Sequence, residues 1–206
     1  MRAQLPGILA MAVIVVVSNI AVQFHYGYYL TYGAFTYPLA FLVNDIVNRV
    51  YGAAAARRVV WAGFVTGLVC SLIGTQIMGE FGPIVTLRVA LASGAAFLFS
   101  QLFDVFLFDR YRTQNWWRAP IIGTLAGTMV DTALFFFIAF SATLVFLEPA
   151  NDVAWAAELG PLLGVGPVAP FWASLAAADL IVKIVIAFVA LLPFRIIVRR
   201  MTAGIA

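Results

Sequence analysis

Six apolar runs, each of roughly 20 residues or more, divide the chain and limit its fold more strongly than any other feature. A run of about 20 apolar residues forms an α-helix long enough to cross the hydrocarbon core of a bilayer. The sequence therefore predicts an all-α integral membrane protein, a six-transmembrane-helix bundle that occupies residues 1–206 as a single domain. The expected spans are residues 5–24, 33–51, 59–78, 85–108, 119–147 and 169–197.

The composition supports this class of protein. Of the 206 residues, 64% are hydrophobic and 10% are charged, whereas soluble domains average about 45–50% apolar and 25% charged residues. The lipid bilayer is therefore the expected surrounding. The formal charge of +3 is explained by the basic residues that orient a membrane protein, so no nucleic-acid partner is expected.

Basic residues occur in alternate connections between the apolar runs. The connections 25–32, 79–83 and 148–168 contain no lysine or arginine. The arginines near the other span ends are Arg57, Arg58, Arg110, Arg112, Arg118, Arg195, Arg199 and Arg200. Because basic residues concentrate on the cytoplasmic side of a membrane, both termini are predicted to be cytoplasmic.

The second predicted span contains charged residues. Residues 32–52 read YGAFTYPLAFLVNDIVNRVYG and place Asp45 and Arg49 four positions apart. On a helix these two side chains share a face and can pair. Pro38 removes a backbone donor, so this helix is expected to bend. A bent, charged membrane helix indicates part of a binding site, and the alternative is a structural ion pair near the inner leaflet.

Other spans also carry polar residues at helical spacing. Gln101 and Asp104 share one face of the fourth span because they are three positions apart. Asp179 and Lys183 are four apart in the sixth span, with the acid first, which favours an ion pair. Arg88 lies at the outer end of its span, away from Asp104, and is expected to extend to lipid headgroups.

Aspartates from four spans outnumber the bases inside the predicted bundle. Such a surplus suits a ligand with several N–H groups, a cationic ligand or a carried proton. We expect a planar heterocycle that stacks on phenylalanine and is held at its edge by carboxylates and carboxamides. The candidate substrate-binding residues are Asn19, Asn44, Asp45, Gln101, Asp131, Phe135 and Asp179. The candidate charge-network or coupling residues are Arg49, Asp104, Lys183 and Arg88.

Several enzyme motifs are absent from the sequence. It contains no G-x-x-x-x-G-K-[ST], no G-x-S-x-G and no H-E-x-x-H. The single histidine, His25, lies in a loop, so no metal site and no cofactor are expected. The sequence therefore indicates that the protein is not an enzyme.

Longer stretches resemble a known family. Residues 32–52, then ARRVV, QLFDVFLFDRYR and WWRAPIIGTLAGTMVDTALFFFIAF, resemble the vitamin-uptake-transporter family, in particular its queuosine-precursor transporters. Ser18–Asn19 and the D-x-x-x-K of Asp179 and Lys183 also resemble the family. Many members of the wider family carry glutamate at the position of Arg49. Members that resemble the queuosine-precursor branch carry arginine there, as this chain does.

The resemblance implies a bacterial inner-membrane importer of 7-deazaguanine bases, the 7-cyano and 7-aminomethyl precursors of queuosine. It also implies a fold similar to the substrate-binding subunits of energy-coupling-factor transporters, acting without the ATPase module. One carboxylate can accept the two adjacent N–H groups of such a base, and Asp131 or Asp45 is the expected acceptor. Asn19 and Gln101 are expected on its carbonyl or pyrrole edge.

Other interpretations stay open at this point. One is a substrate-binding membrane subunit that needs a separate energising complex, and another is a structural or channel-like membrane protein. A homodimer also stays open.

Overall fold

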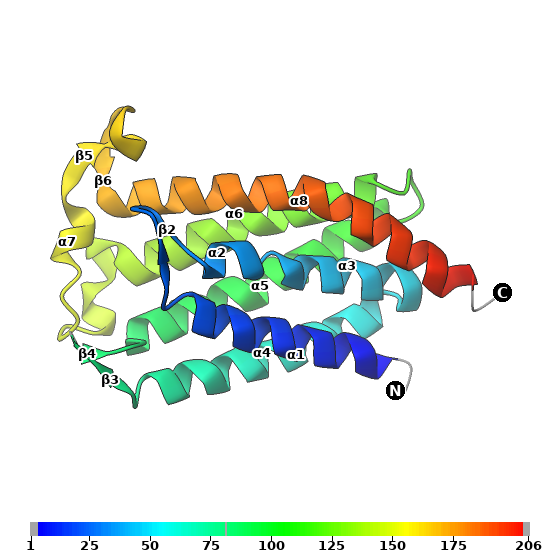
Figure 1. Cartoon of the computed structure of the whole chain (residues 1–206), viewed down its shortest axis with the longest axis horizontal. Coiled ribbons are helices and arrows are strands. Elements are labelled where there is room, and N and C mark those ends of the chain that lie inside the picture. The colour runs from blue at the N-terminus through cyan, green and yellow to red at the C-terminus, as the bar shows by residue number, and fades with distance from the viewer. Residues whose placement is uncertain (1–3, 81, 204–206) are drawn as a thin grey trace.

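The computed structural model describes residues 4–80 and 82–203, and its helices lie side by side along the long axis of the molecule (Figure 1). Four of these helices are long and apolar enough to cross a bilayer: α4 (Ala53–Gly74), α5 (Leu87–Tyr111), α6 (Arg118–Phe140) and α8 (Phe171–Ala203). The apolar helix α1 (Leu5–Ala21) is shorter. The chain is thus a mostly helical, multi-pass membrane protein.

The second predicted span is interrupted at Pro38, which confirms the expected bend. The short helix α2 (Gly33–Thr36) precedes this interruption, and α3 (Leu39–Tyr51) follows it. Gly52 then adopts a φ of 88°, a left-handed conformation that glycine accepts without steric cost. The chain reverses there directly into α4, which for this reason begins before the predicted start at residue 59.

Three short antiparallel hairpins lie at one end of the bundle, and the all-α prediction did not include them (Figure 1). Strand β1 (His25–Tyr26) pairs with β2 (Leu30–Thr31), β3 (Met78–Gly79) with β4 (Gly82–Pro83), and β5 (Leu159–Pro161) with β6 (Val168–Pro170). In these tight connections, the backbone groups of the two short strands of each hairpin pair with each other.

The fifth predicted span is shorter than its apolar run. Helix α6 ends at Phe140 because Ser141 takes an extended conformation with a ψ of 131°. The 3₁₀ helix η2 (Ala142–Leu147) follows, and α7 (Ala154–Ala157) and η3 (Leu162–Gly164) lie in the connection to α8.

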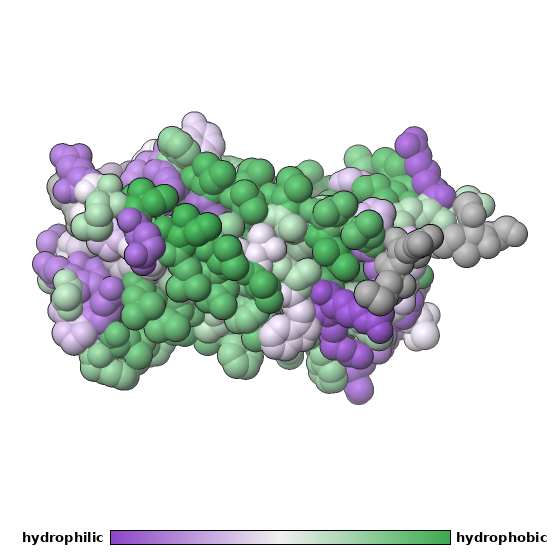
Figure 2. Space-filling model, turned by 90° about the horizontal axis from the view of Figure 1, so that it is seen from below, coloured by the Kyte–Doolittle hydropathy of each residue, from purple (hydrophilic) through white to green (hydrophobic). Residues whose placement is uncertain are grey.

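The surface is apolar over the middle of the bundle. Figure 2 shows a broad hydrophobic region there, with hydrophilic residues gathered toward the two ends. Large apolar side chains are exposed on every long helix, for example Val13, Val65, Phe106, Met129 and Val189. An apolar belt of this extent is expected to face lipid.

Two glycines of α6 allow close packing between helices. A Cβ atom at Gly127 would lie 2.7 Å from Cε1 of Phe41 and 3.1 Å from the carbonyl oxygen of Ser100. A Cβ atom at Gly123 would collide with the carboxylate of Asp104. Small residues at such positions let membrane helices approach one another closely.

Replacing Gly127 by alanine should destabilise the bundle, because overpacking a close contact costs ~1–3 kcal/mol. We expect Gly127→Ala to lower the thermal unfolding temperature in detergent. Gly160→Ala is the matched control, since a Cβ atom there would meet nothing within 4 Å. Equal unfolding temperatures for the two variants would contradict the close packing.

Candidate functional site

Buried polar side chains form two neighbouring clusters among α3, α5, α6 and α8. The lysine cluster consists of Tyr37, Ser100, Asp131, Thr132, Asp179 and Lys183. The acid–amide cluster consists of Asn44, Asp45, Gln101, Asp104, Thr124 and Thr128. The two clusters adjoin because Ser100 precedes Gln101 in α5 and Thr128 lies one turn before Asp131 in α6.

The lysine cluster is centred on the ammonium group of Lys183. Its Nζ atom lies 2.7 Å from Oδ2 of Asp131 and 2.6 Å from Oδ2 of Asp179. The three side chains are between 4% and 12% exposed. The predicted pair of Asp179 and Lys183 is therefore confirmed, and Lys183 also joins α8 to α6 through Asp131.

Asp131 uses both carboxylate oxygens. Its Oδ1 atom accepts hydrogen bonds from the Tyr37 hydroxyl at 2.9 Å and from the Ser100 hydroxyl at 3.3 Å, while Oδ2 accepts from Lys183. Tyr37 lies at the interruption between α2 and α3, and Ser100 lies on α5. The carboxylate of Asp131 thus connects four segments of the bundle.

The acid–amide cluster is held by fewer bonds. Asn44 donates through Nδ2 to Oδ2 of Asp104 at 2.8 Å, and Thr124 donates to Oδ2 of Asp45 at 2.9 Å. Within residues 4–80 and 82–203, no basic side chain lies within 4.0 Å of either carboxylate. Both acids are nevertheless buried, Asp104 completely and Asp45 to 3% exposure.

Several polar atoms of this cluster have no hydrogen-bond partner among the described residues. They are Oδ1 of Asn44, Oδ1 of Asp45, Oε1 and Nε2 of Gln101, Oδ1 of Asp104 and Oγ1 of Thr128. Each unpaired buried group costs about 1–3 kcal/mol, so a stability role alone does not explain them. Their concentration between helices is typical of a ligand-binding site.

A small hollow borders this cluster. It is lined by Asp45, Thr124 and Phe194 together with apolar residues of α3, α6 and α8. Its volume of about 10 Å³ is close to the minimum for one water molecule, and it is far smaller than a bicyclic base needs. The helices are therefore closely packed around these residues in this structure.

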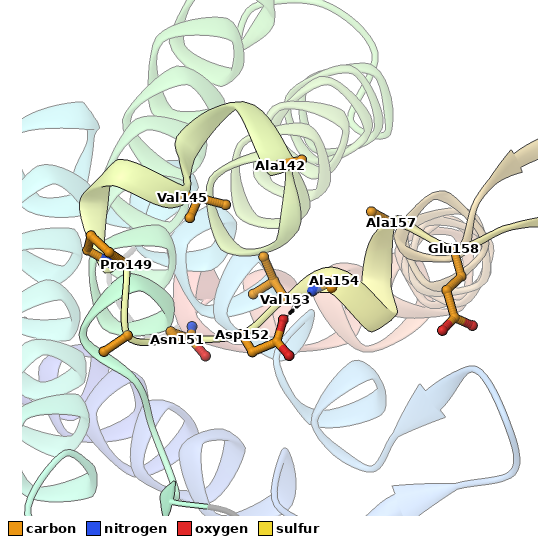
Figure 3. Close-up of a pocket in the computed structure, with 10 residues that line it drawn as sticks. Ala142, Val145, Pro149, Asn151, Asp152, Val153, Ala154, Ala157 and Glu158 are labelled. Atoms are coloured by element: carbon orange, nitrogen blue, oxygen red, sulfur yellow. Dashed lines mark hydrogen bonds between the residues drawn. The ribbon is translucent and has the colours of Figure 1, made fainter.

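A larger hollow of about 560 Å³ lies at the end of the bundle, between η2 and α7 (Figure 3). Its carboxylates belong to Asp152 and Glu158, which are exposed, and Asp152 accepts a hydrogen bond from the Ala154 amide at 2.8 Å. Buried polar groups do not converge there as they do in the two clusters. We therefore assign the candidate site to the interior clusters.

The predicted pair of Asp45 and Arg49 is wrong. The guanidinium of Arg49 donates to the carbonyl oxygens of Arg112 at 2.7 Å and Trp116 at 3.2 Å, and it lies 5.0 Å from the centre of the Phe108 ring. The connection between α5 and α6 offers these acceptors at the end of α3, while Asp45 faces Thr124. Arg49 therefore joins the end of α3 to the connection between α5 and α6 and forms no close ion pair with Asp45.

The prediction that Arg88 extends to lipid headgroups is also wrong, because its side chain is completely buried. Nε of Arg88 donates to the carbonyl oxygen of Ile138 at 2.6 Å, and Nη2 donates to the carbonyl oxygen of Ser141. These carbonyls belong to the C-terminal end of α6, where a cation is favourable. Arg88 thus stabilises a helix end and contacts neither cluster by a hydrogen bond.

Two further predicted residues make no hydrogen bond or ring contact with either cluster. The Asn19 amide donates to the Val15 carbonyl of its own helix at 2.9 Å. Phe135 packs edge-on against Phe136 and Phe140. The other predicted site residues are divided between the clusters, with Asp131, Asp179 and Lys183 in one and Asn44, Asp45, Gln101 and Asp104 in the other.

Sequence reasoning missed three hydroxyl groups of the lysine cluster. They belong to Tyr37, Ser100 and Thr132. Each lies next to a residue that was singled out, since Pro38, Gln101 and Asp131 are their neighbours in the sequence. A search for hydroxyls beside intramembrane polar residues and prolines would have found them.

Comparison with known proteins gives the family. The family described as "Putative vitamin uptake transporter" matches residues 31–198, which include every member of both clusters. The chain belongs to this family. It is a family of transporters, not of enzymes. No solved structure matches the chain.

Curated relatives narrow the comparison. The chain is 38% identical over 125 residues to the "Queuosine precursor transporter" of Escherichia coli (strain K12), and the match covers 55% of this chain and 57% of that protein. It is 32% identical over 126 residues to the "Probable queuosine precursor transporter" of Haemophilus influenzae, covering 56% and 54%. The match thus spans little more than half the length of these relatives.

Removing Lys183 should strongly destabilise the protein, because Asp131 and Asp179 would remain buried without their cation. Breaking a buried ion pair in this way costs about 3–5 kcal/mol, whereas an exposed pair contributes about 0–1 kcal/mol. We expect Lys183→Ala to lower the thermal unfolding temperature far more than Asp109→Asn, which breaks the exposed pair of Asp109 and Arg112. Adding Asp131→Asn to Lys183→Ala should recover part of the loss. Similar unfolding temperatures for Lys183→Ala and Asp109→Asn would contradict this assignment.

Proposed function

We propose that the chain imports the queuosine precursors 7-cyano- and/or 7-aminomethyl-7-deazaguanine across the bacterial inner membrane. The family membership and the names of the curated relatives support a transporter of this substrate class. The observation that carries the proposal is the acid–amide cluster, in which carboxylate and carboxamide atoms lie buried between helices without partners. The hydrogen-bonding edge of a purine-like base supplies the groups that such atoms need.

The proposed topology has six spans with both termini in the cytoplasm. The crossings are α1, the α2–α3 pair, α4, α5, α6 and α8. Helix α1 is about 25 Å long at 1.5 Å per residue, which is close to the thickness of the hydrocarbon core. An even number of crossings requires α1 to begin where α8 ends, and both lie at the same end of the bundle (Figure 1). The arginine-free connections 25–32, 79–83 and 148–168 then face the periplasm.

Asp45 is the better supported acceptor for the two adjacent N–H groups of the base. Asp131 already accepts bonds from Tyr37, Ser100 and Lys183 through its two oxygens. Asp45 accepts from Thr124 alone, its Oδ1 atom has no partner, and it borders the small hollow. A carboxylate that accepts two parallel N–H bonds gives the strong, planar recognition that a guanine-like edge allows.

The remaining groups of the base have partners nearby. The free Oδ1 atom of Asn44 can accept from the pyrrole N–H, and the free Nε2 of Gln101 can donate to the carbonyl group. Phe194 lines the hollow and offers an aromatic face for stacking, a role that the sequence had assigned to Phe135. Because the hollow is too small for the base, α3 and α8 must separate before the base can enter.

A test of this function uses the purified chain in liposomes with a radiolabelled precursor base. We expect uptake without any added partner. Uptake should drop about 10–100-fold in Asp45→Asn, because asparagine presents one acceptor oxygen and an NH2 donor and therefore cannot accept two parallel N–H bonds. Asp109→Asn, which changes an exposed acid, is the matched control and should retain uptake.

Each other outcome has a defined meaning. Tight binding of the base without uptake would favour the alternative, a substrate-binding subunit that needs a separate energising complex. Unchanged uptake by Asp45→Asn would exclude Asp45 as the acceptor. Neither binding nor uptake of either precursor would contradict the proposed substrate class.

A further inference from the structure

Asp45 and Asp104 lie against the same turn of α6. Thr124 of this turn donates to Asp45, and its neighbour Gly123 lies so close to the Asp104 carboxylate that a side chain there would collide with it. On α3, Asn44 donates to Asp104 and is followed directly by Asp45. Two carboxylates from α3 and α5 therefore share one small region of the interior.

The charged groups that surround this region are engaged elsewhere. Arg49 of α3 donates to loop carbonyls, and Lys183 of α8 lies between Asp131 and Asp179. Tyr37 donates to Asp131. The arginines of α4, α6 and α8 are exposed, as is Arg110 of α5, and Arg88 binds the end of α6. Helix α1 contributes no charged residue.

Among the described residues, Asp45 and Asp104 have no basic side chain within 4.0 Å, and ionising both of them in the closed, low-dielectric interior is unfavourable. Removing an unpaired charge from water costs several kcal/mol, and two like charges at close range add to this cost. A single proton shared by the pair removes most of the penalty, as in other carboxylate pairs. One proton on the pair would leave a single negative charge in this region.

We propose that Asp104 binds a proton that enters the cell together with a neutral base, so that the chain is a proton-coupled importer. This inference rests on the proposed function. Asp45 binds the N–H edge of the base best when it is ionised, and a proton on Asp104 keeps it in that form. Binding of the base and binding of the proton therefore favour each other, and this coupling is reciprocal.

A second observation supports a ligand at Asp104. Gln101 lies one turn earlier on the same helix, it is completely buried, and neither its Oε1 nor its Nε2 atom has a partner among the described residues. The Oδ1 atom of Asp104 also lacks a partner. Gln101 can accept a hydrogen bond from the protonated carboxyl or donate one to the carboxylate, so it suits both states of a proton-binding group.

The transport step balances in atoms and charge. One proton binds to Oδ1 of Asp104 from the outer side, and the neutral 7-cyano base binds at Asp45. Both leave on the inner side. Water that replaces the base hydrates the two carboxylates, so that the empty chain can return with Asp104 ionised. Each cycle moves one base and one positive charge inward, so a pH gradient with an alkaline interior drives accumulation.

The test uses the full chain in liposomes with radiolabelled 7-cyano-7-deazaguanine. With the interior more alkaline than the exterior, we expect the base to accumulate above its external concentration. At alkaline pH, the affinity of the wild type should fall about tenfold per pH unit. Asp104→Asn resembles the protonated carboxyl, so its affinity should not depend on pH in this range. This variant should lose gradient-driven accumulation by tenfold or more, while its exchange of internal for external base falls far less.

A matched variant and a direct measurement complete the design. Asp109→Asn, an exposed acid on the same helix, should keep both the pH dependence and the accumulation. Calorimetry of the wild type in buffers of different ionisation enthalpy should show uptake of up to one proton per base bound at alkaline pH. This measurement needs no variant, so it applies even if Asp104→Asn does not fold.

The failures of the two proposals are distinguishable. Wild-type uptake that ignores the pH gradient, or base binding that takes up no proton at any pH, would overturn the proton-coupling inference and leave the proposed function intact. Absence of any binding or uptake by the wild type would overturn the proposed function itself.

Discussion

The ion triad of Lys183, Asp131 and Asp179 is the interaction on which the interior of this bundle depends. Lipid supplies no partner for a charged group, so charges between membrane helices must satisfy one another. Lys183 lies within 2.7 Å of one carboxylate oxygen of each acid, and Tyr37 and Ser100 bind the remaining oxygen of Asp131. These bonds join α8, α6, α5 and the interruption of the second span, and they adjoin the acid–amide cluster through consecutive turns of α5 and α6.

The acid–amide cluster differs from the lysine cluster in one respect, the absence of a cation within 4.0 Å among the described residues. Selection for stability alone would pair such acids or replace them with apolar residues of similar volume. Their unpaired oxygens, and those of Asn44 and Gln101, lower the stability of the closed bundle. A ligand that supplies N–H groups and a proton would remove this penalty. In the proposed function, the fully paired lysine cluster therefore supports the structure, and the incompletely paired acid–amide cluster recognises the substrate.

The sequence predicts what depends on local spacing. Apolar run lengths indicated the long helices, the i,i+4 spacing of Asp179 and Lys183 predicted their pair, and Pro38 predicted the interruption. The partners of Arg49 and Arg88 depend instead on contacts between segments that are distant in the sequence. Arg49 has the right spacing to pair with Asp45, but carbonyl oxygens of a distant loop are its partners. The position of Arg88 suggested headgroups, because nothing in its own helix shows that α6 ends beside it. The acids of the candidate site were predicted from the sequence, whereas the fold was needed to show which hydroxyl group binds which acid.

The ion pairs of Lys183 and the hydrogen bonds of α3 differ in strength, and this difference indicates which contacts the proposed opening of the site would break. Lys183 joins α6 to α8 by buried ion pairs, whose loss costs about 3–5 kcal/mol, and the glycines of α6 hold it close to α5. Helix α3 is joined to these helices by hydrogen bonds with a net value of about 0.5–1.5 kcal/mol each, or somewhat more to a charged acceptor, such as those of Asn44 and Thr124. The N–H groups of a base can replace these bonds directly. In the proposed transport cycle, the bonds of Asn44 and Thr124 are therefore the ones that a base would replace, and the interruption at Pro38 is the candidate hinge for a movement of α3.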